Sequence, residues 1–191
     1  MNRSVAPGAC ALLFLACVPA AAQVQGHRLV ALAEPFPSTG GTPIPDIPGA
    51  TMTALTGGFG PTIGPTGHVA FGGWYVTPST TGDGLFTWNG TAFMTVATLN
   101  VTPAPGTGGA TLGFSYQAYG PPVGADGRVA FRTGYGPSPE GEGVFTASGT
   151  TVTAVALGNP GTTAPTAGWT LNRFGDVTMN PAGRLAFVGS G

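Results

Sequence analysis

GHVAF at residues 67–71 returns as GRVAF at 127–131 and again as GRLAF at 183–187. The final phenylalanines of these three phrases are 60 and 56 residues apart. A repeat of that length is typical of architectures in which each unit is a single supersecondary element that buries its apolar face against its neighbour. The phrase therefore predicts a repeat scaffold, and it carries no catalytic or metal-binding chemistry of its own.

Short β-favouring runs separated by turn residues accompany the phrase. The second unit contains four such runs, at about residues 84–88, 92–98, 110–119 and 128–133. Asn89 and Gly90, between the first two runs, are a strong hairpin signal, because both central residues of the usual two-residue turn need a positive φ. Proline recurs too often along the chain to allow an amphipathic helix of useful length. We therefore expect strands throughout.

The phrase also predicts which side chains share a face. Successive residues of a strand point to opposite faces, so Val69 and Phe71 should lie on one face, with His68 and Ala70 on the other. A small alanine at the fourth position suits a strand that is covered on both faces. This is the situation of a strand packed between two neighbouring sheets.

These features predict an all-β fold of about three four-stranded repeat units, arranged as an incomplete or open β-propeller-like array. The units span about residues 28–76, 84–133 and 143–189 within a β-repeat domain of residues 23–191. A β-sandwich built from the same strands is the alternative. Because an open array leaves an apolar face uncovered at each end, we expect the domain to be part of a longer repeat array or to self-associate.

Residues 1–22 have the pattern of a cleaved signal peptide. Arg3 gives a positive start, residues 10–18 are an apolar run, and residues 19–22 are small enough for a signal peptidase. The run is shorter than the roughly 20 apolar residues of a membrane-spanning helix. A lipoprotein signal ending at Cys17 is less favoured, because Phe14 stands where such signals place a small aliphatic residue. We therefore expect a secreted or cell-surface protein.

Charge and cysteine content exclude several function classes. The chain carries a formal net charge of −1, and only 7% of its residues are charged. Nucleic-acid binding and attraction to an anionic membrane are not indicated, because both need clustered basic residues. Both cysteines, Cys10 and Cys17, lie within the signal segment, so we expect the domain of residues 23–191 to fold without disulfides.

Few polar residues suggest a site. No catalytic, cofactor-binding or metal-binding set is predicted, since no nucleophile with a positioned base and no ligand cluster of the usual spacing is visible. Asp83 and Glu142 recur in phase, each between two glycines, and predict either a solvated turn or an acidic rim that binds cations weakly. The second position of the phrase holds His68, Arg128 and Arg184, which we expect on the solvated side of their strands.

Aromatic side chains are the other candidates, because exposed Trp and Tyr on a rigid β surface stack on sugars or anchor protein partners. The residues in question are Trp74, Tyr75, Trp88, Tyr116, Tyr119, Tyr135 and Trp169. We expect most of them to pack between sheets. Any that stay exposed are candidates for binding a surface glycan or a protein.

Three motifs together resemble those of secreted bacterial propeller-like repeat proteins of uncharacterised function. They are the GxVAF phrase, a Gly-[Leu/Val]-Phe strand at 84–86 and 143–145, and a Val-Ala pair before a Gly/Pro-rich loop at 96–97 and 155–156. The resemblance implies an exported all-β repeat protein, and it assigns no functional residues.

The sequence thus predicts an exported repeat scaffold with a non-enzymatic binding or structural role at the cell surface. The alternative is an extracellular carbohydrate-active hydrolase or lyase on a propeller scaffold. That alternative requires at least two carboxylates to converge in one pocket at the spacing of a catalytic pair. The carboxylates available for such a pair are Asp83, Asp126, Glu142 and Asp176.

Overall fold

The chain divides into two compact units, residues 1–32 and 33–191, and every residue described by the computed structural model belongs to the second. The described residues are 42–44, 46–55, 60–113, 120–136, 141–158, 162–163 and 170–191. The predicted signal peptide and the start of the first repeat unit lie outside them.

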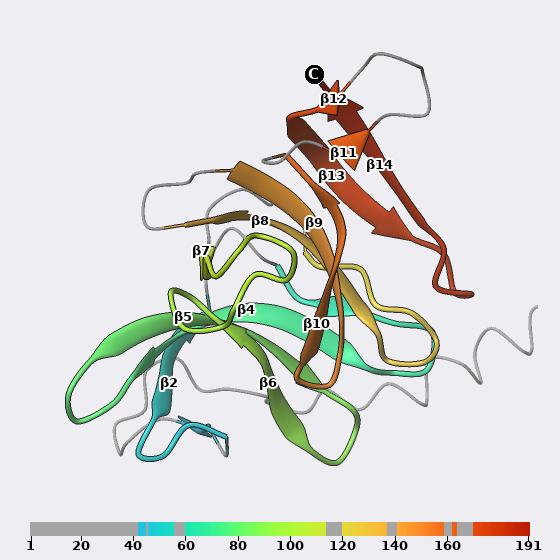
Figure 1. Cartoon of the computed structure of the whole chain (residues 1–191). Helices are drawn as coiled ribbons and strands as arrows, with labels where there is room; N and C mark the ends of the chain where they lie inside the picture. The colour runs from blue at the N-terminus through green and yellow to red at the C-terminus, as the bar shows by residue number, and fades with distance from the viewer. Residues whose placement is uncertain are drawn as a thin grey trace, which may run out of the picture. The chain divides into compact units, whose positions relative to one another are not determined.

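The first sheet is antiparallel and uses the described chain up to Thr98 (Figure 1). Its strands are β1 (Thr42–Pro43), β2 (Thr51–Leu55), β3 (Thr62–Ile63), β4 (Val69–Val76), β5 (Thr81–Trp88) and β6 (Phe93–Thr98). They pair in the order β1-β2-β4-β5-β6, and the short β3 pairs with the beginning of β4.

The second sheet has four antiparallel strands in the order β10-β9-β8-β7, and two short two-stranded sheets follow it. The strands are β7 (Leu112–Gly113), β8 (Val129–Tyr135), β9 (Gly141–Ser148), β10 (Thr151–Leu157), β11 (Thr162–Thr163), β12 (Thr170–Leu171), β13 (Arg173–Met179) and β14 (Leu185–Ser190). All regular elements among the described residues are strands, which confirms the all-β class.

Each phrase forms the start of a strand, and these phrase strands are β4, β8 and β14. In the first two sheets the phrase strand pairs with the strand that follows it along the chain, so that Phe71 lies opposite Phe86 and Phe131 opposite Phe145. The sheets are therefore out of step with the sequence units. The strand near residues 84–88 opens the second sequence unit but belongs to the first sheet.

The predicted alternation of faces is what packs the sheets on one another. Val129 and Phe131 on β8 share a buried cluster with Ala70 and Leu85 of the first sheet. The residue between them, Ala130, faces the opposite way and packs against the β13–β14 hairpin. Ala70 and Ala130 are both fully buried, so a larger side chain at this position would collide with a neighbouring strand.

The hairpin predicted at Asn89 and Gly90 is present, but its turn differs from the expected two-residue form. The hairpin after β5 is a longer loop, residues 89–92, and only Gly90 in it has a positive φ. The Asn89 side chain replaces the second left-handed residue, because its Oδ1 accepts hydrogen bonds from the backbone N–H groups of Thr91 and Ala92 at 3.0 and 2.7 Å. The run at 110–119 contributes only Leu112–Gly113 to a described strand, and residues 114–119 lie outside the described part.

Candidate functional site

The turn before each phrase strand has the same backbone hydrogen bonds in all three copies. We call residues 64–67, 124–127 and 180–183 the phrase turns. In each turn the N–H of the last residue donates to the C=O of the first, at 3.0, 3.1 and 2.8 Å in chain order. The last residue is always a glycine with φ between +77° and +85°, a backbone conformation that other residues rarely adopt.

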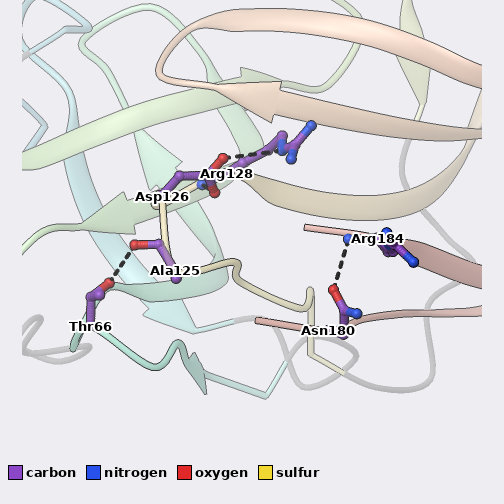
Figure 2. Close-up of polar contacts among 6 residues, drawn as sticks. All are labelled: Thr66, Ala125, Asp126, Arg128, Asn180 and Arg184. Atoms are coloured by element: carbon purple, nitrogen blue, oxygen red, sulfur yellow. Dashed lines mark hydrogen bonds and ion pairs between the residues drawn. The ribbon is translucent and has the colours of Figure 1, made fainter. Parts of the chain in front are cut away.

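Neighbouring phrase turns touch each other. The Thr66 hydroxyl of the first turn donates to the carbonyl oxygen of Ala125 in the second, at 3.0 Å, as Figure 2 shows. The N–H of Ala125 in turn donates to the carbonyl oxygen of Pro181 in the third turn, at 3.2 Å. The three turns are thus joined by direct hydrogen bonds from one sheet to the next.

Two of the candidate residues take part in these contacts. The His68 ring lies over Gly127, where an added Cβ would be 3.0 Å from Nε2, and the Arg128 guanidinium lies over Gly183 in the same manner. His68 and Arg128 are half-buried, and the Arg128 side chain keeps 37% of its surface exposed. The sequence alone could not reveal these contacts, because Gly127 and Gly183 each belong to the next repeat unit.

The remaining contacts of Arg128 and Arg184 are local. Arg128 forms an ion pair with Asp126, in which Nε and Oδ2 are 3.5 Å apart (Figure 2). The backbone N–H of Arg128 also donates a hydrogen bond to Oδ1 of Asp126. Arg184 is exposed, and its N–H donates to Oδ1 of Asn180 at 2.9 Å. The second phrase position therefore contributes to the contacts between turns in the first two copies. His68, Arg128 and Arg184 each directly follow the last residue of a phrase turn.

Glu142 lies within β9 rather than in a turn, and its side chain has a structural partner. Its Oε2 accepts a hydrogen bond from the N–H of Phe174 at 3.3 Å. Its backbone oxygen accepts from Gly158 at 2.7 Å. Glu142 therefore connects the second sheet to the β13–β14 hairpin.

Asp83 occupies the corresponding place in β5, again inside a strand. Its backbone oxygen accepts from Leu99 at 2.9 Å, as that of Glu142 does from Gly158. Its side chain differs, because Oδ1 is buried and has no hydrogen-bond partner among the described residues. Burial raises the pKa of this carboxyl group above its ordinary value.

Asp83 lines a cleft of about 320 Å³. Trp74 lies directly opposite Asp83 in the strand register, and its side chain is 53% exposed. The cleft is lined by Trp74, Tyr75, Thr80, Thr81, Gly82, Asp83, Leu99, Asn100 and Val101, and we call it the Trp74–Asp83 cleft. The carboxyl group of Asp83, the exposed indole of Trp74 and a backbone turn thus meet in this cleft.

Local sequence explains how this cleft is shaped. The Tyr75 ring lies over Gly82, where an added Cβ would be 2.5 Å from the hydroxyl. Burial, and after it the charge of Asp83, raises the pKa of Tyr75. Asn100 follows the end of β6 with φ +57°, the one non-glycine residue of the described part with a positive φ. Asn tolerates this conformation better than most residues, and it turns the chain at the cleft wall.

A second cleft of about 390 Å³ adjoins the first and shares Tyr75 and Val101 with it. Its polar residues include Asp46, whose Oδ2 accepts from the N–H of Thr95 at 2.9 Å, and Thr95 itself, whose hydroxyl is buried without a partner among the described residues. Asp46 carries no signal in the sequence, because nothing in its Pro-rich surroundings distinguishes it from a solvated loop residue.

The carboxylates are not paired in these clefts. The first is lined by Asp83 and the second by Asp46, one carboxylate each, whereas glycoside cleavage needs two across the scissile bond. Within the described residues no group of three or more His, Cys, Asp and Glu could hold a metal ion. The chemistry that this arrangement supports is hydrogen bonding and stacking.

The predicted aromatic candidates separate clearly. Trp74 is exposed, Trp88 is half-buried, and Tyr75 and Tyr135 are buried. Tyr116, Tyr119 and Trp169 lie outside the described residues. Trp74 is therefore the one candidate of the described set with a broadly accessible ring.

Residues 35–191 match the model of a family of unknown function, DUF7453, and the chain belongs to that family. The chain matches no curated protein and no solved structure. Across the described residues there is no helix with the length and apolar character needed to cross a membrane.

Proposed function

We propose that this protein is an exported, non-enzymatic repeat scaffold that binds a surface glycan in the Trp74–Asp83 cleft. Separate observations support export and binding. The signal-peptide pattern of residues 1–22 supports export. The cleft, with its accessible ring and its unpaired acceptor, supports binding.

The different surroundings of Asp83 and Glu142, which recur in phase, are the main support for binding at the cleft. In the second sheet Glu142 lies opposite Gly134, and its carboxylate is occupied by the backbone of β13. In the first sheet Asp83 lies opposite Trp74, and its buried oxygen has no partner among the described residues. A buried polar atom without a partner costs free energy, which a ligand hydroxyl would recover.

The cleft chemistry favours a neutral, hydroxyl-rich ligand. The face of an indole ring binds the C–H face of a sugar, and the carboxyl group of Asp83 accepts a hydrogen bond from a hydroxyl. The amide of Asn100 adds both a donor and an acceptor at the cleft wall.

Affinity measurements on soluble polysaccharides of different composition test the proposal, with retardation in polysaccharide-containing gels as the assay. We expect Trp74→Ala to weaken binding at least tenfold, because truncating an aromatic anchor typically costs more than about 1.4 kcal/mol. Asp83→Asn should weaken binding to the same ligand less, since the amide oxygen still accepts a hydrogen bond.

The matched control is Ile63→Ala, which removes another exposed apolar side chain, 63% exposed, from the other end of the first sheet. It should leave binding unchanged. Equal loss in Trp74→Ala and Ile63→Ala, or no retardation by any polysaccharide, would contradict the proposal. Release of reducing ends from a bound polysaccharide would instead support the hydrolase alternative.

A further inference from the structure

Among the described residues, one edge of strand β14 is open, whereas the corresponding edges of the other phrase strands are occupied. β4 lies between β2 and β5, and β8 lies between β7 and β9. β14 pairs with β13, and no other described strand pairs with it (Figure 1). An open strand edge presents unpaired N–H and C=O groups to any extended segment that reaches it.

Side chains of β14 are also more exposed than those at the same positions of the other phrase strands. Phe71 and Phe131 are 2% and 1% exposed, and each has a second phenylalanine directly opposite. Phe187, at the same phrase position, is half-buried, although it packs edge-on against Phe174. Val188 is 73% exposed. Within the described part of the chain, the third phrase strand is therefore less covered than its counterparts.

The two occupied edges show which kind of strand fits. The strand beside β4 begins with TGDGLFT from residue 81, and the strand beside β8 is GEGVFT from residue 141. In both, the glycine two residues before the phenylalanine lies under its ring: an added Cβ at Gly84 or Gly143 would overlap Phe86 or Phe145. The shared pattern is glycine, acid, glycine, Leu or Val, Phe and Thr.

We propose that the open edge of β14 is a docking site for an antiparallel strand of this pattern. In the register of the first two sheets its phenylalanine would lie opposite Phe187. Main-chain hydrogen bonds would provide the affinity, and the phenylalanine and its glycine would provide the specificity. A second β14 is not the expected occupant, because neither described phrase strand of the larger sheets pairs with another phrase strand. This proposal does not depend on the glycan cleft.

A synthetic peptide of residues 141–158, which forms the β9–β10 hairpin, is the probe, and the full chain is the target. We expect saturable binding by fluorescence anisotropy, with slower amide hydrogen exchange at residues 185–190. Phe145→Ala in the peptide should weaken binding at least tenfold. A scrambled peptide of the same composition is the matched control and should not bind.

N-methylation of single peptide residues distinguishes strand pairing from apolar association. Only alternate N–H groups of a strand face a given edge, so methylation should abolish binding at every second residue of the GEGVFT segment and spare the residues between. Phe187→Ala in the chain should also weaken binding, with unchanged circular dichroism as the check that it folds.

Three outcomes would overturn the proposal. The first is no binding at peptide concentrations up to about 1 mM, the weakest affinity of interest. The second is binding that is insensitive to N-methylation. The third is protection of residues 185–190 that rises with chain concentration in the absence of peptide, because then a second copy of the chain occupies the edge.

Discussion

The Asp83 side chain is half-buried, and desolvation raises the pKa of its carboxyl group, so the folded form holds a proton more tightly than the unfolded form does. Its contribution to stability is therefore present below the ordinary Asp pKa of about 3.9 and is lost as pH rises through the folded pKa. We expect Asp83→Asn to be more stable than the parent at pH 7. Denaturant unfolding at several pH values measures the difference, which should vanish near pH 3. A difference that stays constant with pH would contradict the shift.

At the scale of single residues, the sequence identified both members of the candidate site but not their pairing. Asp83 was recognisable because it recurs in phase with Glu142, and Trp74 because an extra aromatic residue suggests a surface role. Their juxtaposition depends on the register of β4 against β5, which places them opposite each other. Register is set by the turn and by burial of one whole face, and a lone sequence shows neither in full.

The phrase turns are the elements that connect one sheet with the next, and two equivalent glycines test this. Gly67→Ala should cost about 1–2 kcal/mol, because alanine disfavours the left-handed backbone, and nothing described lies within 4 Å of the added Cβ. Gly127→Ala has the same backbone cost and must also displace the His68 ring. We therefore expect Gly127→Ala to be the more destabilising of the two in denaturant melts.

A double-mutant cycle supplies the control for the turn contact. In a His68→Ala background the extra cost of Gly127→Ala over Gly67→Ala should disappear, since the displaced ring is gone. If the difference persists without His68, the two turns are not coupled through this ring. The sequence predicted the glycine at the end of each turn but not its contact, because the contact joins residues of different units.

The strands themselves were the most predictable elements. The phrase strands, their alternation and the strands around Phe86 and Phe145 all follow from short-range patterns of apolar residues and turn signals. The grouping of strands into sheets does not follow from them. It depends on which edge of β4 or β8 meets the next strand, and the sequence repeat is equally compatible with sheets that begin one strand earlier.

Across the whole molecule, stability depends on neighbouring sheets meeting closely at the alanine of the phrase. Ala130 is fully buried against the β13–β14 hairpin, whereas the in-phase Ala186 is exposed. Ala130→Leu should therefore destabilise by about 1–3 kcal/mol through overpacking. Ala186→Leu is the matched control and should change the free energy of unfolding by no more than about 0.5 kcal/mol. Equal effects in denaturant melts would mean that the hairpin does not cover Ala130.

The pairing of strands with close chain neighbours has a consequence for how the molecule assembles. In both larger sheets each strand pairs with one that lies near it along the chain. The loops that must close are short, so little entropy is lost before contacts form, and such topologies reach the native state quickly. All described strands of the first sheet have been synthesised once the chain reaches Thr98, before the second phrase exists. We therefore expect each finished sheet to offer a template surface to the next, so that the order of folding follows the order of synthesis.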